Sequence, residues 1–266
     1  MIKTFKFNNK TVRYSDQAKG NVVVLLHGFL ESLDIFDNFA KKLAEEFRVI
    51  CIDLPGHGKT EVFEQPHSME FMSDIVYEVL KETFVEKCTI IGHSMGGYVT
   101  LSFAEKYPEK LNGFSLFNST PSADNELKRT ARNLTIEDIK NGKKIQICKE
   151  HASKTFANEN VGKFIQEIGF AKIIALNTPE KGIIAALEGM KNRKDFSNIL
   201  ENTDLPFLYV LGMKDNFIPS NILSLLKLPK KSQILILENS GHQGYIEETE
   251  KSVEAVVSFV NYCNSL

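Results

Sequence analysis

The chain has 266 residues, of which 42% are hydrophobic and 25% charged, and its formal net charge is −2. These proportions are typical of a soluble globular protein, and the length suits one main domain that carries an insertion. The near-neutral charge and the lack of a basic tract argue against a nucleic-acid partner. No stretch is long and apolar enough for a signal peptide or a membrane span, so we expect a cytoplasmic protein without a membrane partner.

Four cysteines are spread along the chain, at positions 51, 88, 148 and 263. They do not form the Cys-x-x-Cys pairs that are typical of zinc and redox sites. Cys51 and Cys88 fall inside apolar runs, where free thiols pack as small hydrophobic groups. We therefore expect reduced thiols, no disulfide and no bound metal.

Short apolar runs alternate with amphipathic stretches along most of the chain. Residues 4–7 and 11–15 predict a hairpin. The further predicted strands are 22–26, 48–52, 88–91, 111–117, 206–211 and 233–237. The predicted helices are 35–47, 68–84, 94–107, 220–226 and 246–263. This alternation predicts an α/β fold with a mostly parallel central sheet of about eight strands and helices on both faces.

Residues 121–195 interrupt this alternation, because they contain helical patterns but no convincing strand. The segment also carries more basic than acidic residues. A helical block between two strands predicts a cap over the carboxyl edge of the sheet, where open α/β sheets bind ligands. The predicted organisation is thus a core formed by 1–120 and 196–266 with a helical cap at 121–195.

The segment 92–96 reads Gly-His-Ser-Met-Gly and lies between an apolar run and a helical pattern. This is the Gly-x-Ser-x-Gly spacing of a sharp strand-to-helix turn that exposes a nucleophilic serine, here Ser94. Side chains at positions 92 and 96 would collide with the neighbouring strand and helix, so both positions are glycine. The pattern therefore predicts Ser94 as a nucleophile.

A serine nucleophile needs a base, and the base must be oriented by a third group. His242 follows the last predicted strand, at the carboxyl edge of the sheet, and we predict it as the base. Asp215 follows the strand 206–211 at the same edge and is the predicted acid, and this role is compatible with an Asx turn or a helix cap formed by the same side chain. Asp124, in the predicted cap, is the alternative acid.

The other five histidines all precede Asp215 in the chain, and His57 lies in the loop after the predicted strand 48–52. His93 adjoins the serine, and adjacent side chains diverge at such a turn. His67 and His151 fall in predicted surface or cap segments. His27 ends the first buried strand, and we expect it near the substrate.

Acyl chemistry also requires two donors for the oxyanion. The backbone N–H of Met95 lies at a helix N-terminus, where free amides and the helix dipole favour negative charge. The second donor is expected from the loop after strand 22–26, and Phe29 is the candidate. No metal or organic cofactor is implied by these residues.

The substrate pocket is expected between the core and the cap. The residues predicted to line it are His27, Tyr98, Phe156 and Phe164. We expect the inward face of the cap to be apolar and its cationic side chains to face water, or in part the mouth of the pocket.

Five segments in order resemble the α/β-hydrolase superfamily, and in particular its capped, esterase-like members. The segments are 26–29, 53–58, 92–97, 212–215 and 241–242. The resemblance covers nearly the whole chain and implies the fold described above. The fold hosts esterases, lactonases, carbon–carbon hydrolases, perhydrolases and lyases. The serine at position 94 argues against the dehalogenase and epoxide-hydrolase branches, which place an aspartate there.

The menaquinone-pathway synthase family, a group of lyases, is also similar in its His-Gly-Phe loop and its Ser-Met-Gly-Gly turn. That family usually places an arginine shortly after the turn, where this chain has Tyr98. Arg129, Arg132 and Arg193 are the cationic residues that could hold an anionic substrate instead.

The sequence as a whole predicts a serine hydrolase that cleaves an ester or another activated acyl bond of a small molecule. The alternatives are a lyase with the same triad and a non-catalytic protein that senses a small ligand. The complete serine, histidine and aspartate set argues against a sensor, which needs no triad.

Overall fold

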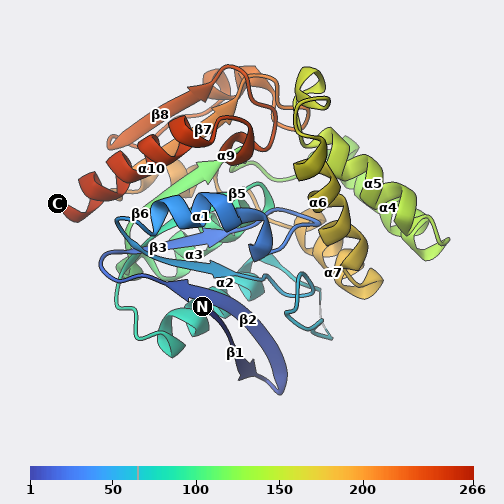
Figure 1. Cartoon of the computed structure of the whole chain (residues 1–266), viewed down its shortest axis with the longest axis horizontal. Helices are drawn as coiled ribbons and strands as arrows, with labels where there is room; N and C mark the ends of the chain where they lie inside the picture. The colour runs from blue at the N-terminus through green and yellow to red at the C-terminus, as the bar shows by residue number, and fades with distance from the viewer. Residues whose placement is uncertain (65) are drawn as a thin grey trace.

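The computed structural model describes residues 1–64 and 66–266. An eight-stranded sheet with the order β1-β2-β4-β3-β5-β6-β7-β8 crosses the molecule (Figure 1). Strand β2 pairs in antiparallel fashion with β1 and β4, and the other pairs are parallel. The strands are β1 (Ile2–Phe7), β2 (Lys10–Gln17), β3 (Val22–Leu26), β4 (Arg48–Ile52), β5 (Cys88–His93), β6 (Leu111–Phe117), β7 (Phe207–Gly212) and β8 (Ser232–Leu237). The predicted fold class is confirmed.

Helices cover both faces of the sheet. Those of the core are α1 (Asp37–Leu43), α2 (Met69–Glu82), α3 (Met95–Lys106), α9 (Gly244–Glu247) and α10 (Thr249–Asn264), with the 3-10 helices η1 (Leu33–Phe36), η2 (Pro108–Lys110) and η4 (Ser220–Leu225). No helix in the described part of the chain is both long and apolar enough to cross a membrane.

Three predicted helices differ from the structure. The stretch 35–47 starts as a 3-10 turn capped by Ser32, and its α-helix ends at Leu43. The stretch 246–263 is interrupted at Glu248, which has φ −132° and ψ 58°. The carboxylate of Glu248 accepts hydrogen bonds from the preceding loop, so local polar contacts compete there with the helix. The stretch 220–226 is a 3-10 helix.

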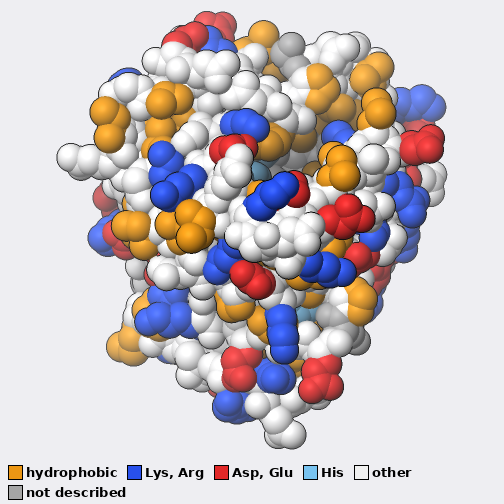
Figure 2. Space-filling model, turned by 90° about the vertical axis from the view of Figure 1, so that its right-hand side faces the viewer, with side chains coloured by type: hydrophobic (Ala, Val, Ile, Leu, Met, Phe, Trp, Pro, Cys, Tyr) orange, Lys and Arg blue, Asp and Glu red, His pale blue; other side chains and the backbone are white. Residues whose placement is uncertain are grey.

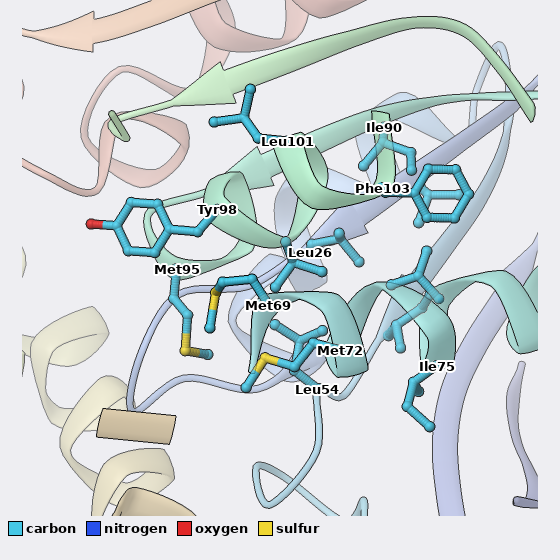
Figure 3. Close-up of a cluster of buried hydrophobic side chains, with 14 of the residues drawn as sticks. Leu26, Leu54, Met69, Met72, Ile75, Ile90, Met95, Tyr98, Leu101 and Phe103 are labelled. Atoms are coloured by element: carbon cyan, nitrogen blue, oxygen red, sulfur yellow. The ribbon is translucent and has the colours of Figure 1, made fainter. Parts of the chain in front are cut away.

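The central strands are buried on both faces, and this explains their unbroken apolar sequences. Helices α2 and α3 pack on one face of the sheet, and α1 and α10 pack on the other. Figure 3 shows part of the hydrophobic cluster on the α2 and α3 face of the sheet. In it, Met69 and Met72 of α2 lie near Met95 of α3 and Leu26 of β3. This packing fixes the start of α3, which directly follows Ser94.

The chain between β6 and β7 is helical, and we call residues 121–195 the helical insertion. It contains α4 (Glu126–Lys140), α5 (Lys144–Lys154), η3 (Asn158–Asn160), α6 (Ile165–Asn177) and α7 (Glu180–Lys191), and α8 (Ser197–Asn202) follows it. Helices α4 to α7 gather at one side of the molecule (Figure 1). On that side, basic and acidic side chains alternate with apolar ones (Figure 2). The exposed apolar side chains of the insertion include Leu127, Leu134, Ile145, Ile165 and Ile173.

Candidate active site

Ser94 lies between β5 and α3 in a strained backbone conformation. Its φ is +50° and its ψ is −114°, outside the regions that non-glycine residues normally adopt. A Cβ atom at Gly96 would meet the backbone carbonyl of Leu26, and one at Gly92 would meet the side chain of Thr100. The turn is therefore possible only with glycine at both flanking positions. Ser94 itself remains partly exposed.

His242 and Asp215 meet at the same edge of the sheet, in the loops after β8 and β7. His242 Nδ1 lies 2.7 Å from Asp215 Oδ2. Burial opposes the charge of the imidazole, but the Asp215 carboxylate outweighs it and raises the pKa of His242 above 6.5. Burial also opposes the charge of Asp215, yet the attraction of His242 and several hydrogen bonds keep the pKa of Asp215 below 3.8. The pair is thus held together by charge as well as by geometry.

The Asp215 carboxylate is fixed by further donors. Its Oδ1 accepts the backbone N–H groups of Phe217 at 2.7 Å and Ile218 at 3.1 Å. Its Oδ2 accepts Asn118 Nδ2 at 2.8 Å, and the same nitrogen donates to the carbonyl of Gly241. Asn118 follows β6 and has a positive φ of 48°, which aims its side chain across the edge of the sheet. These bonds leave Asp215 a single orientation toward His242.

Ser94 and His242 line the same cavity, whose volume is about 460 Å³. This is within the usual range for small-molecule sites. The apolar and aromatic part of the wall consists of Phe29, Tyr98, Ala131, Ile147, Leu187, Met190, Phe217 and Ile218. The polar part consists of Lys128, Arg132, Thr135, Asp138, Glu150, His151 and Lys154, all from the helical insertion.

Two backbone amides are available beside Ser94. Met95 is the first residue of α3, so its N–H has no partner within the helix. Phe29 follows β3, and its side chain lines the cavity. Among the described residues, neither amide donates to a protein acceptor. Both are therefore free to bind an anionic oxygen near Ser94.

Three of the residues predicted to line the pocket lie elsewhere. His27 is fully buried, and its two ring nitrogens contact the carbonyl of Gly28 and the backbone N–H of Leu54. Phe156 is fully buried and packs on Phe164, with ring centroids 6.0 Å apart. For Phe156 and Phe164 the expectation failed because sequence order does not reveal which face of the insertion turns inward. Of the four residues, Tyr98 lines the cavity.

The inward face of the insertion is only partly apolar, and in this it differs from the expectation. Lys128, Arg132 and Lys154 line the cavity beside apolar side chains. Arg132 forms an ion pair with the buried Asp124, which Arg193 also contacts at 2.6 Å. The charges are tolerated there because the cavity is open to solvent and each buried carboxylate has a partner.

Arg193 stacks on Tyr98, the residue at the position where the menaquinone-pathway synthase family usually has an arginine. Its guanidinium lies 3.9 Å from the ring centroid of Tyr98. It is buried, however, and donates to Asp124 and to the carbonyls of Met190 and Ser122. The two terminal nitrogens of Arg193 are therefore already bonded to the protein, while its Nε is buried without a partner among the described residues. Arg129 is exposed and does not line the cavity.

His151 is a residue of the cavity that the sequence interpretation left aside. Its ring lies between Phe29 and Phe217, with centroid distances of 5.5 and 5.4 Å. Burial lowers the pKa of His151 to about 4, so the imidazole is neutral at pH 7. Ile147, His151 and Lys154 share one face of α5, and this helical spacing was the available signal.

His67 is not a surface residue as expected. It is fully buried, and its Nε2 accepts the backbone N–H of Phe63 at 3.2 Å. Burial lowers the pKa of His67 to about 4. His67 therefore supports its own loop and does not reach the cavity.

The model of the alpha/beta hydrolase fold family matches residues 21–249. The match covers most of the chain, and the chain therefore belongs to this family. It is an α/β hydrolase of the esterase-like branch.

Individual relatives are distant. The chain is 25% identical over 251 residues to the pimeloyl-[acyl-carrier protein] methyl ester esterase of Aeromonas hydrophila, covering 91% of this chain and 96% of that protein. It is 27% identical over 244 residues to the dihydrolipoyllysine-residue acetyltransferase component of the acetoin cleaving system of Pseudomonas putida. That match covers 91% of this chain but only 64% of the relative.

A solved structure of a thermophilic esterase from Thermogutta terrifontis superposes with a TM-score of 0.91 at 25% identity. The superposition covers 98% of this chain and 97% of that one. Two of these three proteins are named esterases, and the relative from Pseudomonas putida is named an acetyltransferase component, so the three names do not share one substrate.

Proposed function

We propose that this hydrolase cleaves an ester or another activated acyl bond of a small molecule, with Ser94 as nucleophile, His242 as base and Asp215 as the orienting acid. The observation that carries the proposal is the 2.7 Å contact between His242 and Asp215 beside the strained Ser94 in one cavity. A structural serine would have no need of a positive φ, and a structural histidine would not need a buried carboxylate.

The chemistry proceeds through an acyl-enzyme. His242 takes the proton of Ser94 as the oxygen attacks the acyl carbonyl, and the imidazolium is stabilised by Asp215. The oxyanion binds to the amides of Phe29 and Met95. The tetrahedral intermediate collapses, and His242 gives its proton to the leaving alkoxide. A water molecule, activated by the same histidine, then releases the acid and restores Ser94.

The helical insertion acts as the cap in this proposal. Its backbone contacts support that role, because the N–H of His242 donates to the carbonyl of Thr155 at 2.7 Å. Gly241 also packs against the backbone of Ala157, where a Cβ atom would collide. A change in the insertion would therefore reach both the cavity wall and the loop that carries the base.

The substrate class follows from the two halves of the cavity wall. The aromatic and aliphatic side chains of the wall suit a compact apolar acyl or alcohol group. The cations Lys128 and Arg132 of the same wall suit a carboxylate or another anion, and Arg132 is also paired with Asp124. We therefore expect the enzyme to accept short neutral esters and also esters that carry a distal carboxylate.

A burst experiment tests the mechanism. Wild-type protein mixed with p-nitrophenyl acetate should release a burst of one p-nitrophenol per active site, because acylation precedes slower hydrolysis. Ser94→Ala should give neither burst nor turnover. A wild-type protein that binds acyl compounds but releases no alcohol would be the non-catalytic sensor and would contradict the proposal.

Substitutions of Arg132 and, as a control, Arg129 test whether the cavity binds an anionic group of the substrate. Arg132→Ala should raise the KM of a carboxylate-bearing ester by about tenfold and leave a neutral ester nearly unchanged, since one charged hydrogen bond contributes ~1.5–3 kcal/mol. The exposed Arg129 should tolerate the same change with both substrates. Equal effects of Arg132→Ala on both esters would contradict an anion-binding end of the cavity.

A further inference from the structure

Glu31 is a buried carboxylate behind the candidate active site. It lies in the loop after β3 and only 4% of its surface is exposed. Burial opposes its charge, but the neighbouring His93 and several hydrogen bonds lower the pKa of Glu31 to about 2. A buried charge of this kind is costly unless it is paired and hydrogen-bonded, so its contacts are informative.

Three donors from three different segments converge on this carboxylate. Oε2 accepts the backbone N–H of Gly28 at 2.6 Å and lies 3.0 Å from His93 Nδ1. Oε1 accepts Gln243 Nε2 at 2.6 Å. The three segments are the loop after β3, the end of β5 and the loop after β8.

Each partner of Glu31 is a direct sequence neighbour of a proposed catalytic group. Gly28 precedes Phe29, whose amide is one oxyanion donor. His93 precedes Ser94, and Gln243 follows His242. A single side chain therefore connects the three segments that carry the oxyanion donor, the nucleophile and the base.

His93 extends the connection to the backbone of the base. Its Nε2 lies 2.9 Å from the carbonyl oxygen of His242, while its Nδ1 faces Glu31. Both ring nitrogens thus face oxygen atoms, one from Glu31 and one from the backbone of His242. The other titratable groups around the ring are His242, with a centroid distance of 4.9 Å, and Tyr245 at 5.0 Å, and His27 also lies close by.

From this geometry we infer that Glu31 is a positioning residue. It holds the loop after β3, which carries the Phe29 amide, and the loop after β8, which carries His242, in fixed positions relative to Ser94. The inference rests on the proposed function and goes beyond the triad. Glu31 does not line the cavity and does not touch the substrate. Its effect is therefore on the placement of reacting groups, where a shift of about 1 Å can cost roughly 10²-fold in rate.

Glu31→Gln is the sharpest perturbation, because it keeps the shape of the side chain. The oxygen of the new amide can still accept the N–H of Gly28, and the amide nitrogen then faces Gln243. Gln243 can turn its amide to accept that bond, since its own Oε1 is buried without a partner in the described structure. The variant should fold, and what it loses is the negative charge opposite His93.

The test measures kcat, KM and inhibitor affinity on an ester substrate, with active sites counted by a fluorophosphonate. Glu31→Gln should lower kcat by about 10²-fold with KM within a factor of three. The affinity for a trifluoromethyl ketone, whose hemiketal mimics the oxyanion, should fall in step with kcat/KM. Glu61→Gln is the matched control, because Glu61 also accepts a backbone amide, at 2.6 Å from Thr11, but is far from the cavity.

Gln243→Leu is the second variant, because it removes only one of the three donors. It should show the same pattern, a lower kcat and inhibitor affinity with an unchanged KM, at a smaller size. Wild-type values of kcat per titrated site in the folded variants would overturn the inference, since Glu31 would then serve stability alone. If wild-type protein itself shows no labelled Ser94 and no turnover, the proposed function fails instead.

Discussion

Replacing Asp215 by asparagine separates the charge of the acid from its shape. The backbone amides of Phe217 and Ile218 fix Oδ1 as an acceptor, at 2.7 and 3.1 Å. The new amide nitrogen must therefore occupy the place of Oδ2, which now contacts His242 Nδ1 and Asn118. There it donates to Nδ1 and moves the imidazole proton to Nε2, so the ring can no longer accept the proton of the nucleophile.

The fold should survive this change. Asn118 Oδ1 has no hydrogen-bond partner within the described residues, so the Asn118 amide can turn and accept the new donor. The turn gives up the 3.1 Å bond to the carbonyl of Gly241, at a cost of about 1 kcal/mol. The loss of rate is much larger. We expect kcat to fall by about 10⁴-fold, which corresponds to about 5 kcal/mol of transition-state stabilisation.

The assay is the hydrolysis of p-nitrophenyl acetate, with thermal unfolding followed in parallel. Asp204→Asn is the control, because Asp204 is an exposed aspartate just before β7, at the opposite edge of the sheet. A folded Asp215→Asn variant that keeps more than a tenth of the wild-type kcat would refute the assignment. Loss of activity in Asp124→Asn alone would transfer the role of acid to the helical insertion.

Three further predictions address titration, backbone packing and substrate binding. Because the pKa of His242 is raised, kcat/KM should fall as the pH decreases through a value above 6.5. In Asp215→Asn, the acidic limb of the pH profile of the residual kcat/KM should move to lower pH. An acidic limb that does not move would contradict the pairing of His242 with Asp215. Gly96→Ala should lower the free energy of unfolding, measured by denaturant titration, by about 3 kcal/mol or more, because the new Cβ meets the backbone carbonyl of Leu26. Gly169→Ala in α6 is the control: its Cβ meets nothing within 4 Å, so the change should be neutral or stabilising. His151→Phe keeps an aromatic ring between Phe29 and Phe217 but removes the two ring nitrogens. The KM for polar esters should therefore rise by about two- to tenfold with kcat nearly unchanged. A fall in kcat with an unchanged KM would exclude a role of His151 in substrate binding.

The fold and the convergence of Ser94, His242 and Asp215 were accessible from the sequence for a physical reason. Strands that are buried on both faces need continuous apolar runs, and their carboxyl ends meet at one edge of the sheet. Loop residues that directly follow these strands are therefore neighbours in space. The strained turn at Ser94 also leaves a local mark, because only glycine fits at positions 92 and 96.

The wall of the cavity was not predictable in the same way. Which face of the helical insertion turns inward depends on packing between helices, and amphipathic patterns alone misplaced Phe156 and Phe164. The charged lining adds to this difficulty, because the usual rule places apolar residues inside. The contact of Glu31 with His93 was missed because a buried hydrogen bond between distant segments has no periodic signal in the sequence.

The most direct test of the account is the site of covalent modification by a fluorophosphonate. Peptide mass spectrometry of the labelled protein should find one phosphonyl group, on Ser94, and the rate of labelling should collapse in His242→Ala because the serine loses its base. Labelling at another residue, or labelling of Ser94 at an unchanged rate without His242, would contradict a nucleophile activated by the His242–Asp215 pair.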